Sequence, residues 1–325
     1  MTTERPTYVI VTPAFNEAAY IERTIESVVR QTIRPVRWVI VDDGSTDPTA
    51  QIVQRYVRQY DWMRYLRRER VPGQTYYASN VYALLAGYEA VRDLSFEYLA
   101  ILDADIVLCH RYYEEVFHRL EMNRDMGITA GGLLERINGK LRELEFDRYS
   151  TPKAFQVFRR ACYEQVGGYV ACKHGGEDTC TEILARMNGW KTWSFPDIQA
   201  IHLKPLGTAG GRHVLRARFQ QGLADYCLST HPVFMLAKCM RRCLKDLPRP
   251  LAGVARFAGF LYGYFIRESR ELPDDARRYV RAEQMRRLMA CVGAAPPLWK
   301  PIQPERMVEP PPLTSTCECR TEMGS

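Results

Sequence analysis

The chain has 325 residues, of which 46% are hydrophobic and 26% are charged, and its formal net charge is +7. This length is enough for one large domain or two smaller ones, and the composition is ordinary for a globular protein. The segment Met1 to Pro6 is polar, and the apolar run Tyr8 to Val11 is too short for the core of a signal peptide, so nothing marks the chain for secretion. We therefore expect a cytoplasmic protein.

The cysteines give little support to a disulfide framework. Ten of them are scattered without a repeating short spacing, which favours reduced, mostly buried thiols. The one close pair, Cys317 and Cys319, lacks partner ligands and is weak evidence for zinc.

Strands and helices alternate through the first hundred residues. The expected elements are, in order, a strand at 8–12, a helix at 21–29, a strand at 38–41, a helix at 48–57, a strand at 62–66, a helix at 78–92 and a strand at 98–102. Such alternation predicts an α/β fold, with a mostly parallel central sheet flanked by helices. Ligands of such sheets bind beyond the carboxyl ends of the strands.

Two carboxylates, Asp103 and Asp105, end the apolar run that begins at Leu99. On a strand, residues i and i+2 share a face, so both would point the same way at the edge of the sheet. Mg²⁺ and Mn²⁺ prefer carboxylates together with phosphate oxygens, so the pair indicates a metal that holds a phosphorylated substrate. The alternative is that these residues only cap the turn that closes the strand.

Two common nucleotide-binding motifs are missing. The first strand is not followed by Gly-x-Gly-x-x-Gly, and the chain contains no Walker-type Gly-Lys-Ser/Thr loop. Phosphate must therefore be held in another way, and a metal on the two carboxylates supplies one.

Beyond Asp105 the pattern is mixed. Strands are expected at 127–134 and 154–159, followed by a turn at Gly167-Gly168-Tyr169. A helix that ends near Gly189 follows Glu177 and Asp178, which places both carboxylates near its N-terminus. They would either take part in chemistry or only complement the helix dipole.

Five elements in this order resemble the family 2 glycosyltransferases, whose fold is the nucleotide-diphospho-sugar transferase (GT-A) type. They are Thr12-Pro-Ala-Phe-Asn-Glu after the first strand, Val41-Asp-Asp-Gly-Ser-Thr-Asp after the second, Leu102-Asp-Ala-Asp, the Gly167 turn with Glu177-Asp178, and His202 after a last strand. The resemblance covers roughly residues 7–205.

That resemblance implies a site for a nucleotide diphosphate sugar. Pro13 and Phe15 would line the base pocket, Glu17 would belong to the same donor site, and Asp43 would accept a hydrogen bond from a ring N–H of the base. Physical chemistry agrees, because an aromatic face offers stacking and a carboxylate rejects a base that has no donor at that edge.

The resemblance also implies a metal and a catalytic base. Asp105 would be the principal ligand of Mn²⁺ or Mg²⁺, Asp103 would contact the ribose or the metal, and His202 would complete the site. Asp178 matches the base that takes the proton of an acceptor hydroxyl during attack on the anomeric carbon. Attack from the face opposite the leaving diphosphate inverts the anomer, and the metal with nearby cations stabilises the departing charge.

Two features near the donor site remain open. Lys204 and Arg212 flank a Gly-rich stretch, which would be either a lid that closes over the diphosphate with Arg212 facing it or a flexible linker. Asn80 matches the family pattern, but the Lys or Arg expected near it is absent unless Arg68 or Arg70 replaces it. The Gln-x-x-Arg-Trp motif of processive members is also absent, so we expect a single transfer per encounter.

The chain divides into a catalytic domain at 1–211, a basic helical extension at 212–295 and a disordered tail at 296–325. The extension holds 16 Lys and Arg against 7 Asp and Glu, whereas the rest of the chain holds 29 against 31. Its apolar run Leu251 to Ile266 falls short of the roughly 20 residues that span a bilayer. The extension would lie on the cytoplasmic face of an anionic membrane, or pack on the core as a helical subdomain. No nucleic-acid-binding module accompanies the charge.

These features predict an inverting, metal-dependent transferase that moves a sugar from a nucleotide diphosphate donor to an acceptor hydroxyl. The acceptor would be a saccharide or a lipid-linked molecule used in building a cell-surface polysaccharide or glycolipid. Two alternatives are sugar transfer to polyprenyl phosphate, whose anionic acceptor needs little base catalysis, and a non-catalytic scaffold with the same fold.

Overall fold

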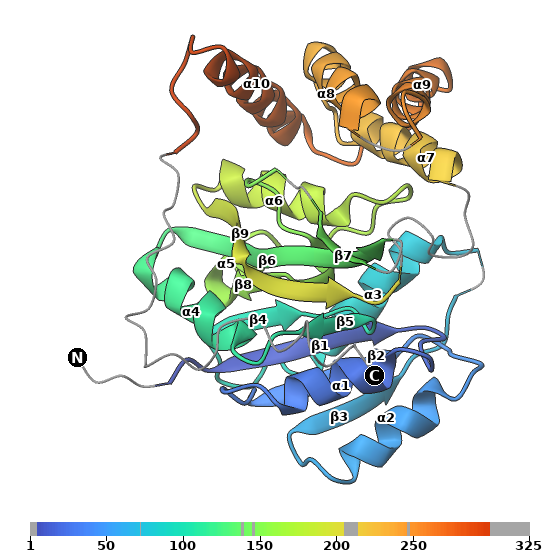
Figure 1. Ribbon diagram of the computed structural model, residues 1–325, viewed down its shortest axis with the longest axis vertical. Coiled ribbons are helices and arrows are strands. Elements are labelled where there is room, and N and C mark those ends of the chain that lie inside the picture. The colour runs from blue at the N-terminus through green and yellow to red at the C-terminus, as the bar shows by residue number, and fades with distance from the viewer. Residues whose placement is uncertain are drawn as a thin grey trace.

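The computed structural model describes residues 5–71, 73–137, 140–144, 147–204, 214–245 and 248–299. Over these residues, one nine-stranded sheet runs through the molecule with helices on its faces, and the C-terminal helices form a group at one end (Figure 1).

The first half of the sheet is parallel, as the alternation of elements predicts. Strands β1 (Tyr8–Ala14), β2 (Arg37–Asp42), β3 (Met63–Arg67) and β4 (Tyr98–Ile101) lie in the order β3-β2-β1-β4. Helices α1 (Ile21–Val29), α2 (Thr49–Val57) and α3 (Tyr76–Glu89) connect them. Every residue of β1 is buried, because helices cover both faces of a parallel sheet.

Beyond β4 the sheet is mixed. Its remaining strands are β5 (Ile106–Leu108), β6 (Met126–Ile137), β7 (Lys140–Glu143), β8 (Val157–Arg159) and β9 (Lys191–His202), in the order β4-β8-β6-β9-β5 with β7 beside β6. Helices α4 (Tyr112–Met122), α5 (Arg160–Gln165) and α6 (Glu177–Met187) belong to this half. Strand β8 is antiparallel to β4 and β6, whereas β6 and β9 are parallel. The expected α/β class is confirmed.

Two expectations about local structure are wrong. Residues 154–159 do not form one strand, because a 3₁₀ helix, η1 (Lys153–Phe155), begins after Pro152 and precedes β8. Asp103 and Asp105 do not lie on a strand either. Strand β4 ends at Ile101, and the chain then turns into β5, a short strand that was not expected; Ile106 N donates to the carbonyl of Asp103 at 3.4 Å.

The expected helical extension is present. It consists of α7 (Val214–Cys227), α8 (Pro232–Lys245), α9 (Leu251–Phe265) and α10 (Asp274–Cys291). Helices α7 and α9 approach closely because glycine lies at the contact: a Cβ on Gly259 would lie 1.9 Å from the carbonyl oxygen of Phe219. Among the described residues, every helix falls short of a membrane span in length or in apolar character.

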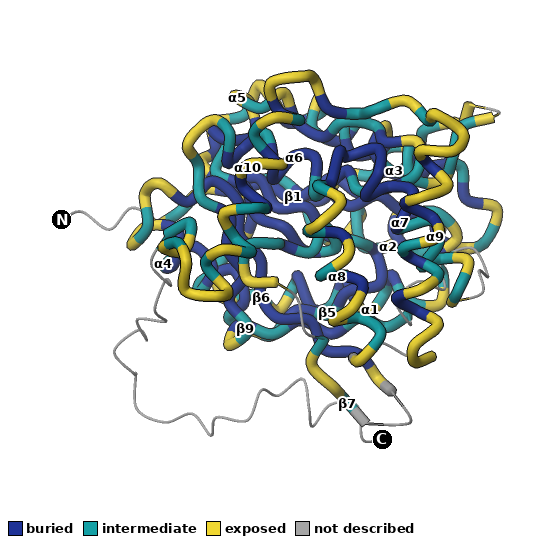
Figure 2. The backbone as a smooth tube through the Cα atoms, turned by 90° about the horizontal axis from the view of Figure 1, so that it is seen from above, coloured by how far each residue is buried: buried dark blue, intermediate teal, exposed yellow. Residues whose placement is uncertain are grey.

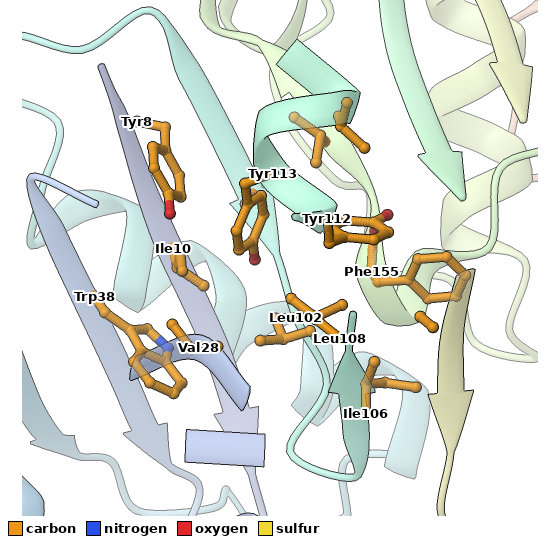
Figure 3. Packing of buried hydrophobic residues seen from close by; sticks show 14 of the residues in the cluster. Tyr8, Ile10, Val28, Trp38, Leu102, Ile106, Leu108, Tyr112, Tyr113 and Phe155 are labelled. Atoms are coloured by element: carbon orange, nitrogen blue, oxygen red, sulfur yellow. The ribbon is translucent and has the colours of Figure 1, made fainter. Parts of the chain in front are cut away.

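The main core lies between the sheet and α1 and α4. Large side chains in this core, among them Tyr8, Trp38, Tyr112, Tyr113 and Phe155, are at most 1% exposed (Figure 3). The Tyr8 ring lies 4.8 Å from that of Tyr113. The buried backbone is concentrated in the central strands, and exposed residues follow the outer helices and loops (Figure 2).

The cysteines are mostly buried free thiols, as expected. Among the described residues, Cys162, Cys172, Cys180, Cys227 and Cys239 are free and buried. Cys109 takes part in a disulfide, so the expectation of reduced thiols is wrong at that position.

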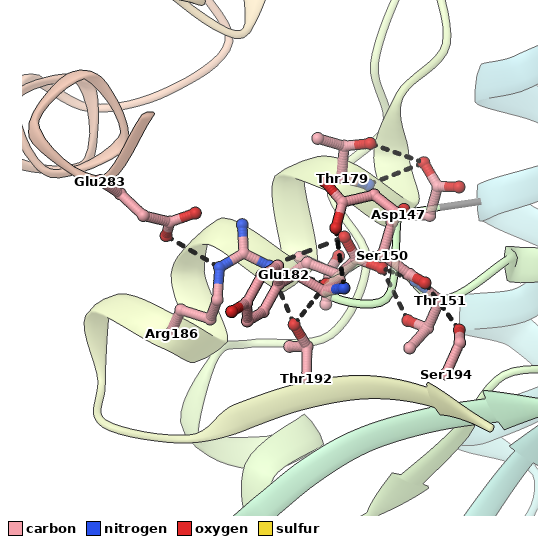
Figure 4. A network of polar contacts seen from close by, with 12 residues as sticks. Asp147, Ser150, Thr151, Thr179, Glu182, Arg186, Thr192, Ser194 and Glu283 are labelled. Atoms are coloured by element: carbon pink, nitrogen blue, oxygen red, sulfur yellow. Dashed lines mark hydrogen bonds and ion pairs between the residues drawn. The ribbon is translucent and has the colours of Figure 1, made fainter. Parts of the chain in front are cut away.

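A buried charged network joins α10 to α6 (Figure 4). Arg186 of α6 donates from Nε to Glu283 of α10 at 2.8 Å and from Nη1 to the hydroxyl of Thr192 at 3.0 Å. Glu182, one turn earlier on α6, accepts from the backbone N–H and the hydroxyl of Thr151 at 2.5 and 2.6 Å. Helix α10 is therefore held to α6 by charged side chains that are buried away from water.

Replacing Arg186 with Leu should lower the free energy of unfolding by ~3–5 kcal/mol, because the buried Glu283 and Glu182 carboxylates lose their principal cation. Urea unfolding followed by circular dichroism measures this loss. Arg278→Leu, at an exposed position of α10, is the matched control and should change stability by about 0.5 kcal/mol or less. Equal effects of the two variants would show that the network does not hold α10.

Candidate active site

The loops that follow β1, β2 and β4 meet at the carboxyl edge of the sheet and line one cavity. Six of the residues predicted from the sequence lie on its wall: Pro13, Phe15, Glu17, Asp43, Asp103 and Asp105. Arg70, Tyr76 and Asn80 contribute to the same wall. The sheet thus brings together side chains that are far apart in the sequence, at the edge where ligands of α/β proteins bind.

Asp43 is held by three donors. Its carboxylate accepts from Arg70 Nε at 2.7 Å and from the hydroxyl of Ser79 at 2.7 Å, and it is paired with Nη1 of Arg68. The Asp43 side chain is only 2% exposed. Both oxygens of the carboxylate predicted to receive a base are therefore already engaged.

Arg70 also covers the aromatic side chain predicted to stack with the base. Its guanidinium carbon lies 3.6 Å from the centre of the Phe15 ring and 5.9 Å from that of Tyr76. Arg70 therefore lies inside the cavity, on both Phe15 and Asp43. The sequence singled it out only as a substitute for a missing cation near Asn80, and this contact was not predicted.

Lys204 joins the loop after β9 to the loop after β1. Its ammonium contacts both carboxylate oxygens of Glu17 and lies 3.9 Å from Oδ2 of Asp105. Burial raises the pKa of Glu17 to about 7, although the hydrogen bond from Lys204 opposes this shift. The charges of Asp105 and Asp103 raise that pKa further, so negative charge is concentrated at this end of the cavity.

Asp105 and His202 lie together, as predicted for metal ligands. Strands β5 and β9 pair Ile106 with His202, and Nε2 of His202 lies 3.3 Å from Oδ2 of Asp105. Burial disfavours the charged form of Asp105, but the hydrogen bond with His202 and the charges of His202 and Lys204 together outweigh burial and hold the pKa of Asp105 below its usual value. The same contact raises the pKa of His202 against the effect of burial.

The ligand atoms at this end of the cavity suit a cation that arrives bound to the substrate. Oδ1 of Asp103 and Nδ1 of His202 are both buried and have no hydrogen-bond partner. Over the described ranges, no group of three or more His, Cys, Asp or Glu side chains is arranged to hold an ion. Mg²⁺ and Mn²⁺ need only one or two carboxylates when substrate phosphates supply other ligands. Asp105 and His202, whose side chains lie together, have ligand atoms of the kind that such a site uses.

Lys153 is a site residue that the sequence analysis missed. This residue of η1 donates to Oδ1 of Asn80 at 2.5 Å and lies 3.2 Å from Oε1 of Glu177. Asp103 and Glu177 raise the pKa of Lys153 although burial opposes this. The cation beside Asn80 is therefore Lys153, whereas Arg68 and Arg70 bind Asp43. The only available signal was the Asn80 pattern itself, because nothing local in the sequence connects residue 153 to it.

Asp178 lies in the first turn of α6, which begins after Gly176 in a left-handed conformation (φ 93°) that glycine tolerates. Its Oδ1 accepts from the backbone N–H of Thr179 at 2.7 Å. Burial, and then the charge of Glu177, raises the pKa of Asp178 to about 6. Such a carboxylate is ionised at neutral pH and still basic enough to accept a proton.

Three predicted residues are not on the cavity wall: Asp178 and His202 do not line it, and Arg212 cannot be placed. Arg212 and the Gly-rich stretch before it lie outside the described residues. The described neighbour of that stretch, Lys204, is bound to Glu17.

Comparison with known proteins identifies a related family. Residues 9–172, just over half of the chain, match the model described as Glycosyl transferase family 2. Glycosyltransferase GlyG of Streptococcus pneumoniae is 24% identical over 122 residues, which are 38% of this chain and 37% of that protein. The putative teichuronic acid biosynthesis glycosyltransferase TuaG of Bacillus subtilis is 32% identical over 105 residues, which are 32% and 38% of the two chains. The matched segments thus span less than two fifths of these relatives.

Solved structures with a similar fold cover more of the chain. The mannosyltransferase PcManGT of Pyrobaculum calidifontis, in complex with GDP-Man and Mn²⁺, has a TM-score of 0.52 at 18% identity and covers 90% of this chain and 88% of its own. Residues 1–349 of TarS from S. aureus, in complex with UDP-GlcNAc, have a TM-score of 0.51 at 15% identity and cover 80% and 73%. These likenesses confirm the GT-A fold.

Proposed function

Because the chain belongs to glycosyl transferase family 2, we propose that it moves a sugar from a nucleotide diphosphate donor to an acceptor hydroxyl, with inversion at the anomeric carbon. The observation that carries this proposal is the meeting of Phe15, Asp43, Asp103 and Asp105 in one cavity. The name of the relative TuaG supports an acceptor in the synthesis of a cell-surface polysaccharide.

The donor base would lie on Pro13 and Phe15 and contact Asp43. Arg70 now occupies these positions, so it must leave the ring of Phe15 before a base can stack there. A guanidinium that leaves a carboxylate can pair equally well with a phosphate, because both accept two parallel hydrogen bonds. Arg70 would therefore bind the incoming diphosphate, a role that it would share with Arg212.

Mn²⁺ or Mg²⁺ would be held by Asp105 and His202, with Asp103 beside them. When bound, such an ion stabilises the negative charge that forms on the departing diphosphate. The chain's own cations act in the same region: Lys204 is paired with Glu17, and Lys153 lies among Asn80, Glu177 and Asp103. They place positive charge beside buried carboxylates in a region that is shielded from water.

Asp178 would act as the general base. The acceptor hydroxyl forms a bond to the anomeric carbon, the bond to the diphosphate breaks with its electron pair on the diphosphate, and the hydroxyl proton passes to Asp178. The charge of Lys153 lowers the pKa of Asp178 and so limits the rise caused by burial. The carboxylate is therefore ready to accept a proton at neutral pH.

Asp178→Asn should reduce the transfer rate by about 10²–10⁴-fold, because the amide cannot accept the proton. In the wild type, the transfer rate should fall about tenfold per pH unit below pH 6, since protonated Asp178 cannot accept a proton. The residual activity of the variant should not show this fall. Release of nucleoside diphosphate over pH 4.5–8 measures both effects. Asp93→Asn, at a side chain that is 95% exposed, is the matched control.

A near-normal rate of Asp178→Asn would contradict the role of Asp178. It is the result expected for transfer to an anionic acceptor such as polyprenyl phosphate, which needs no base.

Asp105→Asn should weaken binding of Mn²⁺ in the presence of a nucleoside diphosphate by about tenfold or more, because a charged ligand becomes neutral. Electron paramagnetic resonance of free Mn²⁺ measures this directly, and chelation should stop sugar transfer by the wild type. Asp125→Asn, whose side chain is 53% exposed, is the control. Unchanged Mn²⁺ affinity in Asp105→Asn would remove Asp105 from the metal site.

The extension would hold the enzyme on an anionic membrane. Exposed apolar residues recur on one face of α8 (Val233, Leu236, Met240, Leu244) and on one face of α9 (Leu251, Val254, Leu261, Tyr262, Phe265); we call them the interfacial stripe. Leu244 is 74% and Phe265 is 83% exposed. The excess of Lys and Arg in this part of the chain complements anionic lipids.

Replacing Leu244 and Phe265 together with Ser should lower binding to phosphatidylcholine vesicles that contain 30% phosphatidylglycerol by about tenfold or more, since each buried apolar side chain contributes ~1.5–3 kcal/mol. Co-sedimentation measures the bound fraction. Val292→Ser, at an apolar residue that is 79% exposed outside the stripe, should bind like the wild type. A wild type that stays in the supernatant with these vesicles would refute membrane binding.

A further inference from the structure

A second cleft lies beside the donor cavity, between the catalytic half and the extension. Its wall is formed by the start of α3 (Thr75, Tyr76, Tyr77), the loop before α6 (Lys173, His174) and helix α7 (Phe219, Gln220, Leu223). The cleft has a volume of about 410 Å³. Sites for small molecules span roughly 300–1,000 Å³, so the cleft can hold one or two sugar rings.

One end of this cleft reaches the reaction site. Tyr76 lines both the cleft and the donor cavity. The Tyr77 ring packs on the loop that leads to Asp178. A Cβ placed on Gly175, in that loop, would lie 3.1 Å from the ring. His174, in the same loop, lies in the cleft wall. A molecule in the cleft therefore lies between the donor cavity and the segment that carries the base.

The other end reaches the interfacial stripe. The Phe219 ring lies 5.5 Å from the ring of Tyr262, which is 43% exposed on α9. Helices α7 and α9 pack closely because glycines lie where they meet. The contact between Phe219 and Tyr262 therefore connects the wall of the cleft to the outer face of the extension. The cleft therefore leads from the reaction site toward the surface that would meet a membrane.

The chemistry of the wall favours an uncharged ring over an anion. Aromatic rings dominate it, and Tyr76 and Tyr77 stand nearly perpendicular, at 79° with centroids 5.8 Å apart. The two basic groups of the loop are already paired, since Lys173 Nζ and His174 Nε2 lie 3.0 and 3.1 Å from the Glu268 carboxylate. Aromatic faces pack on the apolar face of a sugar ring, and nearby polar groups orient its hydroxyls.

We propose that this cleft binds the sugar end of a lipid-linked acceptor, whose hydrocarbon chain leaves past Phe219 and Tyr262 onto the interfacial stripe. This inference rests on the proposed function and names its acceptor class. A hydroxyl of the bound sugar would be the group that Asp178 deprotonates.

The test compares n-decyl hexosides below their critical micelle concentration with the matching methyl hexosides, using the glucoside, galactoside, mannoside and N-acetylglucosaminide. Isothermal titration calorimetry measures their affinities for the full chain. The wild type should bind at least one decyl hexoside about tenfold or more tightly than its methyl counterpart, a difference of about 1.4 kcal/mol. Phe219→Ala, and Gln220→Trp, which fills the cleft, should each reduce this preference several-fold.

Two controls separate this inference from the proposed function. Val214→Ala, an exposed position of α7 that does not line the cleft, should keep the preference. Without any acceptor, the wild type and Val214→Ala should hydrolyse the donor at the same rate, because no described residue of α7 lines the donor cavity. A wild type without a decyl preference, or a preference that both cleft variants retain, would overturn the cleft assignment. Absence of donor hydrolysis in the wild type would instead overturn the proposed function.

Discussion

The site depends on pairing buried carboxylates with two lysines. Glu17, Asp105 and Glu177 are each at most 9% exposed, and burial of ionised groups in this way is unfavourable unless cations lie close by. Lys204 neutralises Glu17 beside Asp105, and Lys153 lies beside Glu177 and Asn80. Each lysine also links loops from distant parts of the sheet. The same contacts therefore hold the cavity together and keep its charge balanced before any ligand binds.

The extension is part of this arrangement. Glu268 binds Lys173 and His174 in the loop before α6. Leu228 packs on Gly176, because a Cβ placed on Gly176 would lie 2.8 Å from the Leu228 side chain. The position of Asp178 therefore depends on helices that follow the catalytic half. The family match ends at residue 172. The loop before α6, helix α6 with Asp178, and the extension therefore lie in the part of the chain that the match does not cover. The cavity at the edge of the sheet also draws on that part of the chain, because His202 lies beside Asp105 and Lys204 is paired with Glu17.

The sequence predicts the sheet well where helices and strands alternate, because burial on both faces gives β1 and β2 continuous apolar runs with polar loops at their ends. It also locates Glu17, Asp43, Asp103 and Asp105, since the carboxyl ends of parallel strands must meet. It does not predict Lys153 at Asn80 or Arg70 on Phe15. Such contacts are set by how loops fold back in three dimensions, and they leave no periodic signal. The placement of Asp103 and Asp105 on a strand was wrong because a short turn also brings two nearby carboxylates to one cavity.

We propose direct displacement at the anomeric carbon, with Asp178 as the base that deprotonates the attacking hydroxyl. Hydrolysis of an α-linked nucleotide sugar followed by proton NMR tests it, because the anomeric proton of the first product is resolved before mutarotation. Inversion, as proposed, predicts that the β anomer is released first. Initial release of the α anomer would mean retention and would contradict the role given to Asp178.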